Sequence, residues 1–391
     1  GLTTELVEVD GEKFKLGCSQ DDPQDLSAEI SRIAEAVGML DVSVETVEDE
    51  SGKGPARYVR NVVGQVDPQA RYQLVSVETR RTTSRPSGPF ITSTLQMSAS
   101  NALGFTASRT MRAAQGLYEG VNVPGEGHVG LITYMRTDST VIAGEAIERA
   151  RGFIGESLGD SYLPEKPRFY GSTNKNAQEA HEAIRPTDVN RLPEQLAGVL
   201  NDDQLKLYRL IRDRFLACQM TDAQWDATTI LLERSDSTTG AILKSSGRVL
   251  VFDGFYKASG VPTASDEQTL PALDEGHLTA PFAIDPKQKF SSPPARFNEG
   301  SLVKKLEEEG IGRPSTYASI IKVIQDRNYV EKRTNRFYAT DLGEVVTEKL
   351  IQGFPGIMDL GYTRWMEEQL DGIEDGEIEW TGFLQEFYDP F

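Results

Sequence analysis

The segment LITYMRTDST, residues 131–140, carries the residue types best suited to chemistry in this chain. We expect a strand over 129–136, in which residues two apart point to the same side, so that Tyr134 and Arg136 face one space. Asp138 then lies just beyond them, available to orient the guanidinium. A phenol, with an ordinary pKa of about 10, is a poor nucleophile at neutral pH. A fixed arginine beside it stabilises a forming phenolate and grips the oxygens of a phosphoryl group under attack. The same spacing also fits a purely structural pair.

A second cluster is QEAHEAIRP, residues 178–186. If this segment is helical, His181 and Arg185 share one face and Pro186 ends the element. The cluster lacks the second histidine of a His-Glu-x-x-His motif, so it gives zinc hydrolysis no support. The alternative is a capping or core histidine next to a surface arginine.

A third cluster spans residues 301–338. SLVKKLEEE predicts a helix, GIG a tight turn, and the run Arg313-Pro314-Ser315-Thr316 a second helix with proline at its first position. A hairpin follows, turning at Thr334-Asn335. Helix, turn, helix and β-wing is typical of nucleic-acid binding, and the N-terminus of the second helix offers N–H groups to a phosphate. A winged-helix packing module that binds no DNA remains the alternative.

Strand and helix patterns divide the chain that positions these clusters. β-patterns before residue 84 and after 222 predict one discontinuous β-domain with a helical domain inserted into it, and a third unit begins past Pro286. The expected helices cover 26–40, 92–104, 107–120, 146–159 and 201–220, a loop covers 121–128, and further strands cover 71–82, 225–235, 240–255 and 277–284. The alternation around Asp10-Gly11 predicts a hairpin, which we prefer to reading Glu8, Asp10 and Glu12 as an acidic metal triad.

Composition excludes several classes of protein. At 391 residues with 38% hydrophobic content, the chain has enough apolar material for two or three domains. No apolar run approaches the roughly 20 residues that span a bilayer, so we expect no membrane partner. Two cysteines exclude a disulfide scaffold, and three histidines leave few ligands for a metal hydrolase. The first residues carry neither a signal peptide nor an initiator methionine, and we expect a reducing cytoplasm and a chain cut from something longer.

The net charge of −19 would argue against nucleic acid if it were evenly spread. Residues 1–80 carry −8 and residues 341–391 carry −11, so the 260 residues between them are neutral overall. Within that middle part, 302–338 carries +3, and Arg80, Arg81 and Arg85 form a second basic patch where the acidic N-terminal part meets it. The average therefore does not exclude DNA.

Several of these motifs resemble, together and in order, the bacterial type IA DNA topoisomerases. The matching segments lie between about residues 80 and 331 and read RPSGPFITSTLQ, GLITYMRTDST, QEAHEAIRPTDV, CQMTDAQWDATT, PPARFNEGSLVKKLEEEGIGRPSTYASII and IQDRNYVEK. The resemblance implies that Tyr134 attacks a single-strand DNA phosphodiester and forms a 5′-phosphotyrosyl bond. It implies that Arg136 stabilises the scissile phosphate and that His181 supports the site. DNA-binding roles are implied for Arg313, Ser315, Thr316, Arg327, Arg185, Gln96 and Asp138.

The resemblance also implies a fold class and a reaction. The fold is a multidomain α+β torus, with a β-arch domain II at 1–84 plus 222–285, an α-rich domain III at 85–221 that carries the tyrosine, and a winged-helix-like, α-rich domain IV at 286–391. The reaction relaxes negatively supercoiled duplex through a cut single-stranded segment and needs no ATP. A cytoplasmic, nucleoid-associated monomer is implied.

One departure from the family is important. The family's TOPRIM domain supplies a catalytic Glu, a Lys and a DxDxE triad for Mg²⁺, and this sequence contains no such segment. We therefore expect a fragment with the gate and arch but half of the active site, inactive alone, whose metal site lies outside this chain. A separate polypeptide that supplies TOPRIM is one alternative, and the coding sequence upstream of Gly1 would decide it. A non-enzymatic module, either a single-strand binder or a partner-binding scaffold, is the other.

Overall fold

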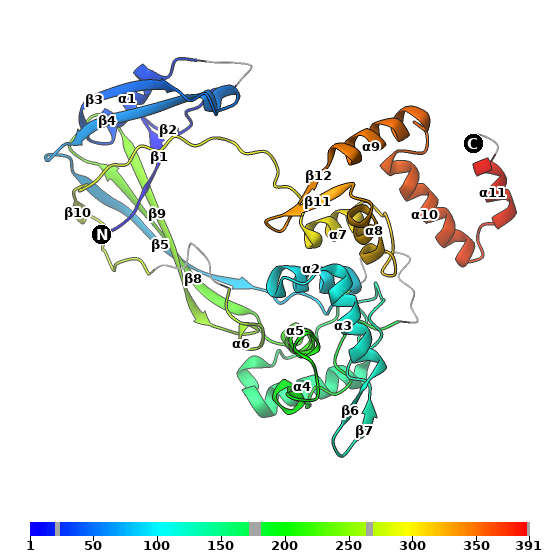
Figure 1. The fold of residues 1–391 in the computed structure, drawn as a ribbon. Coiled ribbons are helices and arrows are strands. Elements are labelled where there is room, and N and C mark those ends of the chain that lie inside the picture. The colour runs from blue at the N-terminus through cyan, green and yellow to red at the C-terminus, as the bar shows by residue number, and fades with distance from the viewer. Residues whose placement is uncertain (20–23, 172–180, 263–268, 389–391) are drawn as a thin grey trace. The chain divides into compact units, whose positions relative to one another are not determined.

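The computed structural model describes residues 1–19, 24–171, 181–262 and 269–388. It divides into two compact units, each drawn in Figure 1. The first unit combines residues 1–84, 223–253 and 262–294, and the second combines 85–222, 254–261 and 295–391. The separation of 85–221 from 286–391 into two domains stays a prediction, because 85–221 and 295–391 belong to the same second unit, while 286–294 belong to the first.

A six-stranded antiparallel sheet dominates the first unit. Its strand order is β10-β5-β8-β9-β1-β2. The strands are β1 (Glu5–Val9), β2 (Glu12–Lys13), β5 (Tyr72–Ser84), β8 (Ala223–Arg234), β9 (Ala241–Phe252) and β10 (Leu278–Thr279). Tyr72, Leu74, Ile230 and Leu232 are buried together on one face of β5 and β8, as the period of two in a strand requires. The predicted strands at 71–82, 225–235 and 240–255 are confirmed, whereas only two residues of 277–284 pair.

Turn chemistry explains the hairpins of this unit. The predicted turn at Asp10-Gly11 is confirmed, since Glu8 pairs with Lys13 and Val9 with Glu12, and both turn residues have positive φ. The predicted helix over 26–40 is too long. Helix α1 (Ser27–Ala36) ends before Gly38, whose φ is 94°, and the chain continues into β3 (Met39–Glu48). β3 pairs with β4 (Tyr58–Val66) across a short 3₁₀ turn at Gly54–Arg57.

Helices form most of the second unit. Those of residues 85–261 are α2 (Thr92–Leu103), α3 (Ala107–Glu119), α4 (Gly144–Leu158), α5 (Asp202–Cys218) and α6 (Tyr256–Ser259), with 3₁₀ turns at Asp160–Tyr162 and Pro193–Leu196. The predicted C-termini at Gly104 and Gly120 are confirmed, and both glycines have positive φ. The core between these helices includes Phe90, Leu117 and Tyr208, each fully buried.

The loop expected over 121–128 is in fact a small hairpin. Strands β6 (Val121–Val123) and β7 (Gly127–Val129) pair in antiparallel fashion. Gly125 lies in its turn and Gly127 begins β7, and their φ values are 85° and 82°. Glycine and proline punctuation here marks a tight turn rather than an irregular connection.

The predicted helix-turn-helix with a β-wing is present in the second unit. Its elements are α7 (Glu299–Glu308), α8 (Tyr317–Asp326), β11 (Val330–Arg333) and β12 (Arg336–Ala339), followed by α9 (Asp341–Gly353), α10 (Leu360–Glu374) and α11 (Trp380–Tyr388). The wing turns at Thr334-Asn335 as predicted, with positive φ at both residues. Pro314 was expected at the first helical position, but it lies in a turn, and α8 begins after Thr316. Within the described residues, no helix has the length and apolar character needed to cross a membrane.

The packing of the second unit predicts that alanine substitutions at two leucines lower its stability by different amounts. Leu117 of α3 is fully buried, whereas Leu384 of α11 is 49% exposed. We expect Leu117→Ala to lower the free energy of unfolding by about 2–5 kcal/mol, because it leaves a cavity and removes buried apolar surface. We expect the matched control Leu384→Ala to change it by less than about 1 kcal/mol. Urea titration followed by circular dichroism measures both, and equal losses would contradict this description of the core.

Candidate active site

The segment that carries Tyr134 and Arg136 is a loop, so the prediction of a strand over 129–136 is wrong. Strand β7 ends at Val129, and in the rest of that range only Ile132 makes a β-bridge, to Pro186. Side-chain exposure nevertheless alternates as a strand would require. Tyr134 and Arg136 are exposed, and Met135 and Thr137 are buried. The loop therefore presents both reactive side chains to solvent.

Hydrogen bonds to a neighbouring segment hold the loop before Tyr134. The Thr133 N–H donates to Arg185 O (2.9 Å), and the Arg185 N–H donates to Thr133 Oγ1 (3.0 Å). The Thr133 hydroxyl also donates to Ala183 O (2.7 Å). This pairing occupies the backbone groups of 183–185 that a helix would need. Residues 181–186 are accordingly not helical, which corrects the second cluster's predicted helix, and residues 178–180 lie outside the described residues.

Three aromatic rings meet at Tyr134. The centroid of its ring lies 5.3 Å from that of Tyr118 in an edge-on arrangement and 5.6 Å from that of His181. Tyr134 is nevertheless 36% exposed. Such ring pairs are worth about 0.5–1.5 kcal/mol beyond the area they bury, so they restrict the orientation of the phenol without covering it. The structure thus brings together Tyr134 and His181, which lie 47 residues apart in sequence.

Arg136 is an exposed cation that makes no ion pair with Asp138. Neither residue has a side-chain hydrogen bond or salt bridge within the part of the chain that the structure describes. The expectation that Asp138 orients the guanidinium is therefore wrong for this conformation. Asp138 acts electrostatically on Tyr317 instead. Burial raises the pKa of the Tyr317 phenol, and the carboxylates of Glu307 and Asp138 raise it further.

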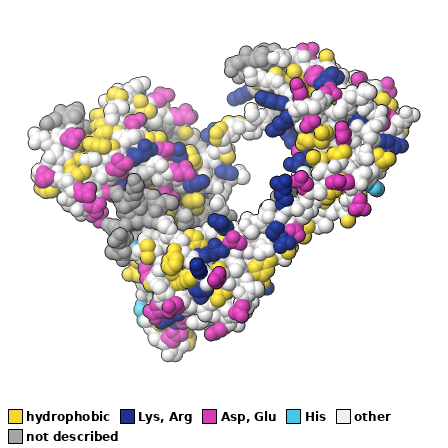
Figure 2. Space-filling model, turned by 180° about the vertical axis from the view of Figure 1, so that it is seen from behind, with side chains coloured by type: hydrophobic (Ala, Val, Ile, Leu, Met, Phe, Trp, Pro, Cys, Tyr) yellow, Lys and Arg dark blue, Asp and Glu magenta, His cyan; other side chains and the backbone are white. Residues whose placement is uncertain are grey.

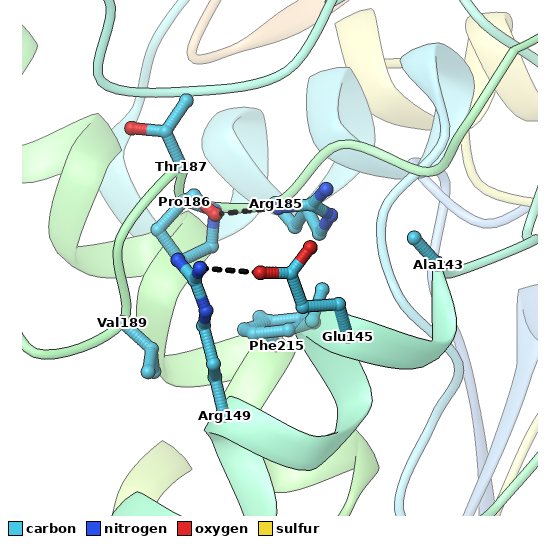
Figure 3. Close-up of a pocket in the computed structure, with 9 residues that line it drawn as sticks. Ala143, Glu145, Arg149, Arg185, Pro186, Thr187, Val189 and Phe215 are labelled. Atoms are coloured by element: carbon cyan, nitrogen blue, oxygen red, sulfur yellow. Dashed lines mark hydrogen bonds and ion pairs between the residues drawn. The ribbon is translucent and has the colours of Figure 1, made fainter.

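Arg185 lies in the wall of a cavity of about 100 Å³. Its guanidinium binds the Glu182 carboxylate (2.6 Å) and Pro186 O (3.2 Å), and its side chain is 16% exposed. Figure 3 shows the Glu145 carboxylate of the same cavity bonded to Arg149. Each arginine of the cavity is thus paired with an acid, and a phosphate would have to compete with a carboxylate for either one.

Gln96 is buried within α2 and does not reach the surface. Its side chain is 1% exposed, and neither its amide nitrogen nor its amide oxygen has a hydrogen-bond partner among the described residues. A direct contact between Gln96 and DNA would require the side chain to leave the core. The predicted contact between Gln96 and DNA therefore does not fit this conformation. The buried Gln96 amide without a partner is itself unusual, because such a group costs free energy and is uncommon in a folded protein.

Arg313 is held by the acidic face of α10. Its guanidinium donates to both carboxylate oxygens of Asp371 (3.2 and 2.5 Å) and to Gly312 O (2.8 Å). Glu367 accepts the Gly312 N–H (2.9 Å). Most of the guanidinium N–H groups are used in these bonds. Arg313 therefore stabilises the turn before α8. In this conformation its guanidinium is not available for the phosphate contact that the resemblance implies.

The other predicted DNA contacts lie on or beside α8. Thr316 closes the turn, since its hydroxyl accepts the Arg313 N–H at 2.8 Å. Ser315 is exposed at the N-terminal end of the helix, and Arg327 is exposed at the C-terminal end. At 1.5 Å per residue, a ten-residue helix separates these two ends by about 15 Å. A single strand that contacts both would have to follow the length of α8.

Helix α2 connects the Tyr134 loop to the helix-turn-helix. The Ser93 hydroxyl donates to Glu307 of α7 (2.6 Å), and the buried Glu299 carboxylate accepts the Ala107 N–H (3.1 Å). On its other side, Thr92 bonds to Met135 and Thr137 of the loop. Sequence reasoning missed these residues. The sequence contains one indication of the contacts made by Thr92 and Ser93: in the TSTLQ motif, hydroxyl side chains occupy the start of a predicted helix, where they can bond to backbone groups.

The basic patch expected around Arg80, Arg81 and Arg85 is neutralised by acids. Arg80 binds Glu78 and Arg81 binds Asp226, while the guanidinium of Arg85 lies 3.8 Å from Asp222. Figure 2 shows Lys and Arg side chains interspersed with Asp and Glu over the drawn face of the molecule. A run of cations in the sequence is therefore not a free cationic surface in the fold.

The described residues contain no group of three or more His, Cys, Asp or Glu side chains placed to hold a metal ion. Of the apparent triad Glu8, Asp10 and Glu12, Asp10 binds Arg32 (2.8 Å). The residues present thus do not fit the magnesium site that the resemblance implies. We assign no step of the chemistry to a metal held by these residues.

Comparison with known proteins identifies the family. The family described as DNA topoisomerase matches residues 44–385. The DNA topoisomerase 1 of Vibrio cholerae is 48% identical over 323 residues, which are 83% of this chain and 35% of that protein. The Escherichia coli DNA topoisomerase 1 is 47% identical, with 83% and 36% covered. The chain thus spans about a third of the length of these relatives.

A solved structure agrees with the sequence comparison. The structure of full-length topoisomerase I from Thermotoga maritima matches with a TM-score of 0.72 and 32% identity, over 97% of this chain and 63% of that one. The resemblance and the mixed α and β multidomain fold expected from it are thus confirmed. On the family match over most of its length, this chain belongs to the DNA topoisomerase family, in the bacterial type IA class.

Proposed function

We propose that this chain supplies the nucleophile and the phosphate-contacting arginine of a type IA topoisomerase reaction. The observation that carries the proposal is the loop at residues 133–137, which exposes Tyr134 and Arg136 while hydrogen bonds hold Thr133, Met135 and Thr137 around them. Single-stranded DNA is the substrate bound at this loop, and negatively supercoiled duplex is the substrate of the whole reaction.

The reaction at Tyr134 is a reversible exchange of phosphodiester bonds. The phenolic oxygen bonds to phosphorus as the bond from phosphorus to O3′ breaks. The phenol loses its proton, and the leaving oxygen gains one to become a 3′-hydroxyl. The phosphotyrosyl bond keeps the energy of the cut linkage, so the reverse attack by the 3′-hydroxyl closes the strand without ATP.

Charge, ring contact and accessibility support the roles of four residues. Arg136 has no competing carboxylate partner among the described residues, so its planar guanidinium can bind two oxygens of the phosphate as negative charge builds up. The His181 ring contacts Tyr134 and restricts the phenol to a narrower set of orientations. Ser315 and Arg327 are exposed along α8, where they can contact the DNA backbone on either side of the cut.

Replacing Tyr134 tests the nucleophile. We expect Tyr134→Phe to abolish covalent capture of a 3′-labelled single-stranded oligonucleotide, because phenylalanine keeps the ring and lacks the attacking oxygen. The assay uses a full-length enzyme built with this chain, such as a chimera in which it replaces the matching third of the Vibrio cholerae relative. Denaturing gels measure the labelled adduct.

Tyr118→Phe is the matched control for this experiment. Tyr118 is 41% exposed and its ring contacts that of Tyr134, so the control removes a neighbouring phenol from the same surface. We expect it to retain capture. Persistent capture in Tyr134→Phe would reject Tyr134 as the nucleophile.

The 391-residue chain alone tests where the remaining catalytic groups lie. We expect it to leave negatively supercoiled plasmid unrelaxed in the presence of Mg²⁺, because its described residues form no metal-holding cluster and its sequence lacks the TOPRIM motifs. Agarose-gel separation of topoisomers measures the outcome. Relaxation that is lost in Tyr134→Phe would show instead that these residues suffice.

A further inference from the structure

Thr92 is a completely buried residue whose backbone N–H and side-chain hydroxyl both bond to the Tyr134 loop. Its backbone N–H donates to Thr137 O (2.9 Å). Its hydroxyl oxygen accepts the Thr137 N–H (2.9 Å). The same hydroxyl shares its proton between Met135 O (2.8 Å) and Thr137 O (3.1 Å). Thr92 is 0% exposed, and Met135 and Thr137 are each 1% exposed, so water does not compete for these bonds.

These bonds fix the backbone on both sides of Arg136. The Met135 carbonyl belongs to the peptide unit before Arg136, and the Thr137 N–H belongs to the peptide unit after it. Each peptide unit is planar, so the only soft rotations between the two units are φ and ψ of Arg136. A single hydroxyl that holds both units therefore restricts both angles, and with them the direction in which the Arg136 side chain leaves the backbone.

The Thr92 hydroxyl is not needed to cap its own helix. At the start of α2, the Thr94 hydroxyl accepts the Ile91 N–H (3.0 Å) and donates to Ile91 O (3.1 Å). Thr92 is the first helical residue, where the hydroxyl has no role in the helical hydrogen-bond ladder. The Thr92 hydroxyl therefore bonds to the loop, at residues 43 and 45 positions away in the sequence.

We propose that Thr92 is a positioning residue for the strand-cutting reaction. Its hydroxyl holds the backbone of Arg136 so that the exposed guanidinium meets the DNA phosphate beside Tyr134. This inference rests on the proposed function of Arg136. It adds a second position, on a different segment of the chain, that determines phosphate binding without touching the DNA.

Binding of single-stranded DNA by the 391-residue chain tests the proposal. Fluorescence anisotropy of a labelled oligonucleotide at one fixed salt concentration gives the dissociation constant. We expect Arg136→Ala to weaken binding about tenfold and Thr92→Val about fivefold, through loss of one charged contact and one buried bonding group. Thr92→Ser keeps the hydroxyl and is expected to bind like the unmodified chain. In the double variant, Thr92→Val is expected to add nothing to the loss from Arg136→Ala.

Thr110→Val is the matched control. Thr110 is also 0% exposed, and among the described residues its hydroxyl bonds only to the carbonyl oxygen of Thr106, the N-cap of its own helix (3.0 Å). We expect this variant to lower the melting temperature by about as much as Thr92→Val and to leave DNA affinity unchanged. Wild-type affinity in Thr92→Val, or an equal loss with and without Arg136, would overturn the positioning role.

Three outcomes distinguish a failure of this inference from a failure of the proposed function. If Thr92→Ser binds DNA as weakly as Arg136→Ala, the hydroxyl is not responsible and the proposal fails, even where Thr92→Val does not fold. If Arg136→Ala binds like the unmodified chain, the proposed role of Arg136 fails and this inference fails with it. A loss in Arg136→Ala without a loss in Thr92→Val overturns the inference alone.

Discussion

Hydrogen bonds from two other segments substitute for secondary structure in the loop that carries Tyr134. Residues 183–185 hold the loop before the tyrosine, and Thr92 holds it after. A strand would have fixed these backbone groups by regular pairing on each side. Here the Thr92 hydroxyl bonds to the backbone of Met135 and Thr137 inside the loop, and the Thr133 hydroxyl of the loop bonds to the backbone of 183–185.

The same dependence connects the loop with the rest of the second unit. The first turn of α2 bonds to the loop through Thr92 and to α7 through Ser93 and Glu307. The Tyr317 phenol of α8 lies within electrostatic reach of Asp138 and Glu307. A small displacement of α2 would therefore move the Tyr134 loop and α7 together. The acids of α10 act similarly on Arg313, whose guanidinium holds the turn before α8.

Local patterns were enough to predict most of the helices and the hairpins. The glycines after α2 and α3 and the two-residue turns at Asp10-Gly11 and Thr334-Asn335 carry their structural signal within a few residues. The strands β3 and β4 were missed, although their sequences alternate, because the apolar residues at the end of α1 continue its helical pattern. Boundaries of this kind depend on a single residue, here Gly38.

The site was predictable in its residue types and less so in its contacts. The motifs placed Tyr134, Arg136 and His181 in one family site, and the rings of Tyr134 and His181 do meet. The partners of the charged residues were not visible in the sequence. Arg313 pairs with Asp371, 58 positions away, and Arg136 has no partner where Asp138 was expected. Pairings between distant segments depend on how helices pack, which no local pattern records.

Identifying the residue that bonds covalently to DNA tests this account most directly. In a full-length enzyme built with this chain, the covalent complex can be trapped, digested with nuclease and trypsin, and sequenced by tandem mass spectrometry. The tryptic peptide from Ala113 to Arg136 contains both Tyr118 and Tyr134, so fragment ions must distinguish them. The account predicts the phosphorylated nucleotide remnant on Tyr134. A remnant on Tyr118, or on a peptide outside this chain, would contradict it.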